Sequence, residues 1–209
     1  MIKTQVMSFT FFYLFSVLAQ ANQWIVGGSL GVAWGEADSS SLNKQLTDRG
    51  INATVSSIDS NRIASQVFVG YEYLPRWGVE VGYVDLGDIE AAINGTLSGI
   101  NNYFTTGQDI YPQSATGWQV SSIYRYPVGG KLQWSGRLGI YSWTTDYTLQ
   151  ALNNSQKVSD DGMDVIYGLG LEIGEWIKSG GIIGQVNWDR YSINGESIDV
   201  LGFGVSYRF

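Results

Sequence analysis

The sequence contains no cysteine and no histidine. Without cysteine, the chain has no disulfide framework and no thiolate nucleophile. Without histidine, a Ser-His-Asp catalytic triad is impossible. Catalysis by a pair of carboxylates stays formally open. The absences nevertheless favour a protein that is not an enzyme, and no residue pattern predicts a cofactor.

Basic residues are also scarce, because 12 Lys and Arg stand against 19 Asp and Glu and give a net charge of −7. A nucleic-acid partner is not expected, since phosphate binding requires basic patches. Proline is rare at 3 residues, whereas there are 27 glycines and 14% of the residues are aromatic. A length of 209 residues favours one domain, or two small ones.

Long hydrophobic runs are missing except at the N-terminus. Lys3 precedes the run VMSFTFFYLFSVL, and Ala19-Gln20-Ala21 supplies the small-x-small pattern that signal peptidase needs. We predict a secretory signal peptide over residues 1–21 and a mature chain over residues 22–209. The alternative is a membrane anchor, but the run is shorter than the roughly 20 residues of a spanning helix and no basic stop follows it.

The rest of the sequence shows a period of two, which is typical of β-strands with two unlike faces. Each alternating segment is close to the roughly 9–11 residues with which a tilted strand crosses a bilayer. The segments are residues 24–34, 63–74, 79–88, 116–126, 132–143, 163–173, 181–191 and 197–209.

The connections between these segments alternate between short and long. Short connections rich in proline and glycine are residues 75–78, 127–131 and 174–180. Long polar connections are residues 35–62, 89–115 and 144–162, and the short segment 192–196 falls on their side. Tight turns at one end and long loops at the other end are typical of outer-membrane barrels.

The two faces of the segments show which side is inside. In the ending LGFGVSYRF, one face carries Leu201, Phe203, Val205, Tyr207 and Phe209, and the other face carries glycines, Ser206 and Arg208. The bulky set would overfill a small lumen, whereas lipid would solvate it. The sequence therefore predicts an all-β fold, an eight-stranded antiparallel up-and-down transmembrane β-barrel.

The eight tryptophans divide into two groups along this path. Tryptophan prefers the membrane–water interface, so two aromatic belts are expected, one at each end of the barrel. The belt at the short turns would hold Trp24, Trp77, Trp134 and Trp176, and the belt at the long loops would hold Trp34, Trp118, Trp143 and Trp188.

The hairpin FVGYEYLPRWGVEVGYVDLGD, the strand YGLGLEI and the ending VSYRF resemble the OmpA-like outer-membrane β-barrel family. The resemblance implies a barrel in the outer membrane of a Gram-negative bacterium, surrounded by lipid and lipopolysaccharide. It also implies that Tyr207 and Phe209 form the recognition signal for the barrel assembly machinery. Because the sequence stops at the last strand, we expect no periplasmic peptidoglycan-binding domain.

Seven charged residues fall on the inward face of the predicted barrel. An isolated ion in a narrow lumen is costly, so these residues should pair, with Arg125 or Arg208 bridging Glu72 and Glu80. Two interpretations are open: a structural plug of salt bridges, or a gate whose pairs exchange to pass ions. The seven are Glu72, Glu80, Arg125, Arg137, Glu172, Asp189 and Arg208.

The long loops leave several functions open. The acidic stretch 159–164 has oxygen ligands for a weak divalent cation, but its spacing does not match an EF-hand, and a solvated loop is the simpler interpretation. Aromatic residues in 100–104 have two interpretations, contact with a host or neighbouring cell or packing on the rim. Our first hypothesis is a non-enzymatic barrel that supports membrane integrity and displays loops for adhesion. The alternatives are a narrow ion or small-solute pore and, third, an enzyme with carboxylates in its loops.

Overall fold

The structure is a computed structural model, and it describes residues 24–35, 39–48, 50, 53–59, 61–87, 90–95, 115–151, 154–174, 181–193 and 195–209. The predicted signal peptide, Trp176 and residues 100–104 lie outside the described residues.

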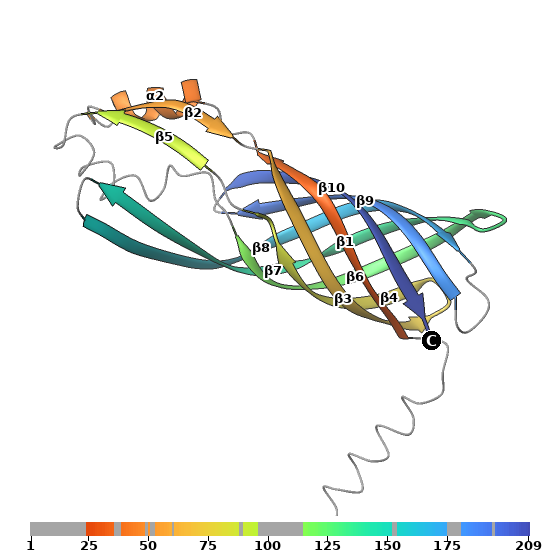
Figure 1. The fold of residues 1–209 in the computed structure, drawn as a ribbon. Coiled ribbons are helices and arrows are strands. Elements are labelled where there is room, and N and C mark those ends of the chain that lie inside the picture. The colour runs from red at the N-terminus through yellow and green to blue at the C-terminus, as the bar shows by residue number, and fades with distance from the viewer. Residues whose placement is uncertain are drawn as a thin grey trace, which may run out of the picture.

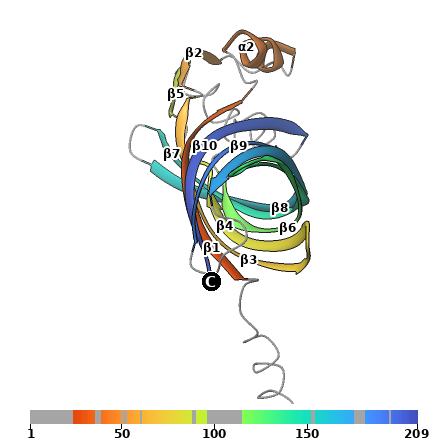
Figure 2. The ribbon, with the colours of Figure 1, turned by 90° about the vertical axis from the view of Figure 1, so that its right-hand side faces the viewer.

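Eight strands form a closed barrel in which every neighbouring pair is antiparallel (Figures 1 and 2). The first barrel strand closes the ring by pairing with both the second and the last barrel strand. This confirms the predicted fold class. The barrel strands are β1 Trp24–Gly35, β3 Arg62–Leu74, β4 Trp77–Asp85, β6 Thr116–Gly129, β7 Leu132–Ala151, β8 Asn154–Gly174, β9 Gly181–Ile193 and β10 Glu196–Arg208.

The connection between β3 and β4 is tighter than predicted. Leu74 pairs with Trp77 and Glu72 pairs with Gly78, so the turn contains Pro75 and Arg76 alone rather than residues 75–78. A register shift between Glu72 and Leu74 accommodates this short turn. We call this end of the barrel, near the C-terminus, the turn end, and we call the opposite end the loop end.

The predicted long loop 144–162 is wrong, because β7 and β8 continue through it as a hairpin. Their pairing extends without interruption to Ala151 opposite Asn154, and the hairpin projects beyond the barrel (Figure 1). The bilayer thickness limits only the lipid-facing part of a strand. Outside lipid, a strand can consist of polar and β-branched residues such as Thr144, Thr145 and Thr148, so hydrophobic alternation does not mark it.

The other two long connections also contain regular structure. Helix α2 (Ser39–Asp48) and strand β2 (Ala53–Asp59) follow β1, and β5 (Glu90–Gly95) follows β4. Strands β2 and β5 form an antiparallel two-stranded sheet, which lies beyond the loop end (Figure 1). Among the described residues, no helix is both long enough and apolar enough to cross a membrane.

Side chains alternate between the lumen and the outer wall as predicted. On β3, Val67 and Val69 are 63% and 44% exposed, whereas Phe68 between them is 3% exposed. The outer wall is formed largely by valine, leucine, isoleucine and aromatic residues on every barrel strand. A wall of this composition requires lipid rather than water as its solvent.

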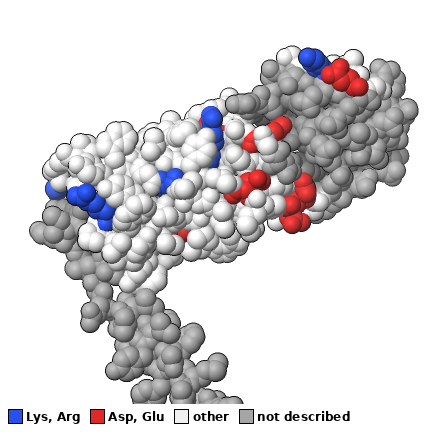
Figure 3. Space-filling model, turned by 180° about the vertical axis from the view of Figure 1, so that it is seen from behind, with Lys and Arg blue, Asp and Glu red and all other residues white. Residues whose placement is uncertain are grey.

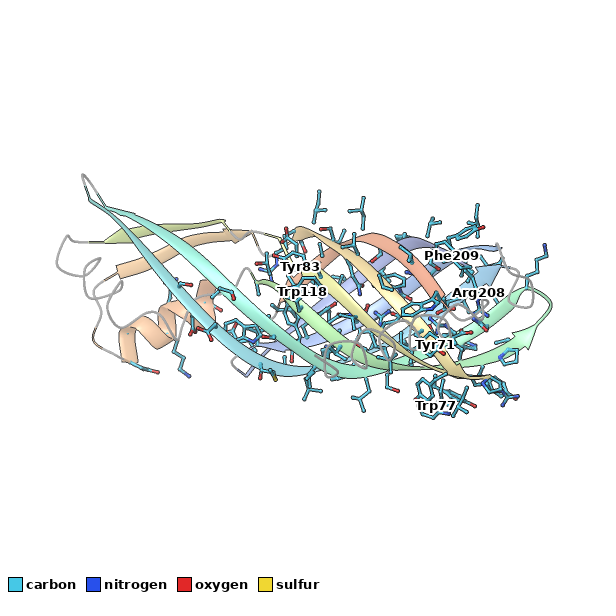
Figure 4. The ribbon with its side chains drawn as sticks, turned by 90° about the horizontal axis from the view of Figure 1, so that it is seen from below. Tyr71, Trp77, Tyr83, Trp118, Arg208 and Phe209 are labelled. Carbon is cyan, nitrogen blue, oxygen red and sulfur yellow. The ribbon has the colours of Figure 1, made fainter. Side chains whose placement is uncertain are left out.

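Aromatic pairs cross neighbouring strands near both ends of the wall (Figure 4). At the turn end the ring centres of Trp24 and Tyr71 are 5.0 Å apart, and at the loop end those of Tyr83 and Trp118 are 5.4 Å apart. These pairs fit the two interfacial belts.

Trp143 does not belong to the loop-end belt, because it points into the barrel. It is 1% exposed, and its Nε1 donates to Asp164 Oδ2 at 2.9 Å. We had assigned Trp143 to the belt from its position along the strand. We had not considered whether the alternation of side chains points it outward or inward. Trp143 shares the inward face of β7 with Tyr141, which is also buried.

We predict that Leu138→Arg destabilises the barrel by about 2–4 kcal/mol in lipid, because Leu138 is exposed on the outer wall in the middle of β7. Ile63→Arg is the matched control. Ile63 is also exposed on the outer wall, but it lies at the loop end of β3, where about 0–1 kcal/mol is expected. Urea unfolding in liposomes measures both changes, and equal costs at the two sites would contradict the assigned membrane position.

Candidate functional site: the barrel lumen

Arg125 on β6 is the centre of an ionic network in the turn-end half of the lumen. Its Nη2 lies 2.7 Å from Glu80 Oε1, its Nε 3.1 Å from Glu172 Oε2, and its Nη1 3.4 Å from Glu72 Oε1. The three glutamates come from β4, β8 and β3. One guanidinium therefore bridges Glu72 and Glu80, and it links β6 to β3 and β8, which are not its neighbours in the barrel.

Two further arginines extend the network. Arg137 on β7 donates from Nη2 to Glu80 at 3.0 Å and from Nη1 to Asp189 at 2.8 Å. Arg208 on β10 donates to Glu72 at 2.6 Å. The structure thus brings all seven predicted inward charges into one connected set.

Burial makes this network a structural necessity. The side chains of Arg125 and Arg137 are 8% exposed, and that of Glu80 is 1% exposed. Ions removed from water must be paired and hydrogen-bonded, and Gln133 adds a hydrogen bond of 2.8 Å to Glu172.

Glycines on the inward face provide space for these long side chains. Gly70 lies opposite Glu80 in register, and a Cβ at Gly70 would be 3.0 Å from Glu80 Cγ. A Cβ at Gly168 would overlap the Asp189 carboxylate. The alternation of glycine with charge along the inward face is therefore required by packing.

An apolar layer fills the loop-end half of the lumen, and our sequence reasoning missed it. The sequence did indicate this layer, because several of its residues are an even number of positions from Arg137 or Asp189 on the same strand and therefore face inward. The layer consists of Ala33, Ala64, Val84, Leu86, Ala115, Tyr141, Trp143, Ile166, Tyr191, Ile193, Ile198 and Val200, all of them buried.

Tyrosines join the apolar layer to the polar residues beneath it. The rings of Tyr141 and Tyr191 meet edge to face, with centres 5.1 Å apart. The Tyr191 hydroxyl donates to Gln119 Oε1 at 3.2 Å, and Asp189 lies two residues before Tyr191 on the same face. A cavity lined by Gln66, Asn187 and Asp189 has room for about one water molecule.

The acidic stretch 159–164 lies in strand β8, so the prediction that it forms a loop is wrong. In a strand, successive side chains point to opposite faces, which separates the carboxylates. Asp161 pairs with Thr144 on the exposed side, whereas Asp164 accepts a hydrogen bond from buried Trp143. Among the described residues, no group of three acids is placed to hold a metal ion.

Tyr207 and Phe209 are exposed on the outer wall, with ring centres 5.0 Å apart, and Figure 4 shows Phe209 at the turn end. The Phe209 amide donates to the Trp24 carbonyl at 3.0 Å, which fixes the last residue against β1. Both rings are therefore accessible from the membrane. Recognition of these two rings by the assembly machinery stays a prediction.

We predict that Arg125→Ala costs about 3–5 kcal/mol of unfolding free energy in lipid, because it leaves buried carboxylates without their partner. Arg76→Ala is the control. Arg76 is exposed in the β3–β4 turn, and removing it should cost no more than about 0.5 kcal/mol. Replacing Glu80 by Gln together with Arg125→Ala should cost less than the sum of the two single changes, and additive costs would exclude a direct interaction.

Comparison with known proteins agrees with this geometry. The family model of the OmpA-like transmembrane domain matches residues 19–176. Outer membrane protein A of Escherichia fergusonii and of Shigella dysenteriae are each 26% identical over 214 residues, which cover 93% of this chain and 52% of the relative. The chain thus spans about half the length of these curated relatives.

Solved structures of eight-stranded barrels are also similar. Ail, the attachment invasion locus protein of Yersinia pestis, has 13% identity and a TM-score of 0.48, with 90% of this chain and 99% of that chain covered. The N-terminal β-barrel domain of Pseudomonas aeruginosa OprF has 11% identity and a TM-score of 0.49, with 90% and 100% covered. On the family match, this chain belongs to the OmpA-like transmembrane domain family, the β-barrels of the Gram-negative outer membrane.

Proposed function

We propose that this protein is a non-enzymatic outer-membrane barrel that supports membrane integrity and displays an extracellular platform for contact with other surfaces. It reaches the membrane after removal of residues 1–21. The observation that carries the proposal is the regular structure beyond the loop end. There the β7–β8 hairpin extends past the last barrel pairing of its neighbours, and α2 and the β2–β5 sheet accompany it (Figure 1).

The charge of this end favours a particular kind of partner. Acidic side chains gather toward the loop end, whereas most of the barrel wall shown in Figure 3 is uncharged. Asp85, Asp160 and Asp161 are exposed there, and the whole chain carries a net charge of −7. An acidic surface steers association with basic surfaces and disfavours polyanions.

Hairpin removal tests the platform. Replacing residues 146–159 by a two-residue Asn-Gly turn shortens β7 and β8 above their pairing with β6 and β9 and leaves the barrel register intact. Bacteria that express the shortened protein should adhere less to host-cell monolayers and to one another than bacteria that express the full chain. The control is Asp160→Asn with Asp161→Asn, which retains the hairpin and should weaken adhesion only to basic surfaces.

Two results would overturn the proposed contact function. One is that the full chain gives no more adhesion than an empty vector at equal surface expression. The other is that the shortened protein adheres as well as the full chain. Resistance to proteolysis of the membrane-embedded barrel verifies that each variant is folded.

The alternative function, a narrow ion pore, would require two layers to open in series. The ionic network occupies one half of the lumen, and the apolar layer fills the other. Exchange of salt-bridge partners would leave Trp143 and Tyr191 packed as before, and a packed apolar constriction excludes hydrated ions.

We therefore predict no large steady conductance for the unmodified protein in planar bilayers. Arg125→Ala should not create one, because the apolar layer lies outside the network. Single-channel recording measures both. A steady conductance in the unmodified protein would reject the plug and favour the pore.

A further inference from the structure

A charged pair lies on the outer wall of the barrel, where the other side chains are suited to lipid. Arg190 on β9 and Asp199 on β10 are opposite each other in register. Arg190 Nε donates to Asp199 Oδ1 at 2.8 Å, and Nη2 donates to Oδ2 at 2.6 Å. The alternation places both on the outer wall, because Asp189 and Val200 beside them face the lumen.

Aromatic residues surround this pair. Tyr167 on β8 is opposite Arg190, and Trp34 on β1 is opposite Asp199, so the row across four strands is Tyr167, Arg190, Asp199, Trp34. The Arg190 guanidinium carbon lies 5.6 Å from the centre of the Trp188 ring. The Trp188 and Tyr167 rings are themselves 6.1 Å apart, edge to face.

The height of Arg190 in the membrane follows from its place on β9 and from the aromatic residues beside it, because Arg190 lies three residues before the loop-end limit of β9 at Ile193. On the turn-end side, the neighbouring positions in the same four strands are Leu169, Trp188, Leu201 and Val32. These four positions carry no charge, and Trp188 is one of the predicted residues of the loop-end belt. Since interfacial aromatics mark the boundary between acyl chains and headgroups, Arg190 lies at the headgroup level of the outer leaflet.

The geometry of the pair leaves Arg190 able to bind a second anion. Asp199 occupies the edge formed by Nε and Nη2, and a guanidinium has another edge that includes Nη1. The Arg190 side chain is 31% exposed, against 10% for Asp199, so the cation is the member that faces outward. Tyr167 lies opposite Arg190 on β8, so its ring and hydroxyl border the same part of the wall.

Arg190 is also distinctive by its position. Among the side chains that the structure describes on the barrel strands, it is the only Lys or Arg on the outer wall. Arg62, Arg125, Arg137 and Arg208 face the lumen. Arginine binds phosphate through two parallel hydrogen bonds, and flanking aromatic rings hold its planar group in place.

We propose that Arg190, with Tyr167 and Trp188 beside it, binds a phosphate group of an outer-leaflet lipid. Asp199 pairs with one edge of the guanidinium and is itself almost covered, so it does not contact the phosphate. The inference goes beyond the proposed contact function, since it concerns the membrane-facing wall and not the platform outside.

The test measures lipid retained by the full-length protein. The protein is folded in detergent micelles, incubated with lipid A that carries its phosphates or with enzymatically dephosphorylated lipid A, and analysed by native mass spectrometry. Arg190→Gln should reduce retention of the phosphorylated lipid by about tenfold, which corresponds to loss of a charge-assisted hydrogen bond. Retention of the dephosphorylated lipid should be low for every variant.

Two variants distinguish binding from a merely structural pair. Asp199→Asn breaks the ion pair but retains Arg190, so it should keep or increase lipid retention. Arg76→Gln removes an arginine that lies over the Tyr126 ring at 5.2 Å, a similar geometry at the turn end, and should change nothing. The proposal is overturned if Arg190→Gln retains lipid A normally, or if Asp199→Asn loses it equally.

The source of the phosphate is decided by competition. Excess inorganic phosphate should leave the bound lipid in place, since a lipid also gains contacts of its acyl chains with the apolar row. Displacement of the lipid by inorganic phosphate would reject the lipid as the ligand. Equal retention of phosphorylated and dephosphorylated lipid A would reject phosphate recognition altogether.

Discussion

In hydrocarbon, each backbone N–H and C=O must find its partner within the protein, and this constraint determines the rest of the structure. The chain satisfies it by closing the sheet, with β1 paired to β3 on one side and to β10 on the other. A ring of eight strands has an interior just wide enough for side chains. Because the closed barrel is this narrow, side chains must fill its lumen, and the size of each inward residue is limited by its neighbours.

The lumen is packed with two materials that depend on each other. Arg125 joins three glutamates only because the glycines opposite leave space for long side chains. The pairs are strong only where water is scarce, and the buried rings of Tyr141, Trp143 and Tyr191 limit access from the loop end. The apolar layer thus keeps the ionic layer in a medium of low dielectric constant, while the ionic layer links distant strands.

Much of this could be predicted from the sequence, because alternation in lipid is a strict rule. It placed Glu72, Glu80 and Arg125 on one face, and the structure joins them. The same alternation also places Trp143 inside, because Trp143 is six residues from the inward Arg137 on the same strand. The extended hairpin could not be found in this way, since a strand in water needs no apolar face. Pairing of β2 with β5 joins residues far apart in the sequence, and no local pattern encodes it.

The distribution of charge gives the barrel a direction. At the turn end the charges face the lumen and pair with one another, and the exposed residues of the wall there are mostly apolar and aromatic. At the loop end the lumen is largely apolar, with Arg62 beside the apolar layer, and an ion pair lies on the wall between Arg190 and Asp199. An outward charge is tolerated only near an interface, so this pair resists movement toward the middle of the bilayer. The charges at the turn end thus face the lumen and not the lipid. At the loop end, the Arg190–Asp199 pair on the wall fixes the depth of the barrel in the outer leaflet.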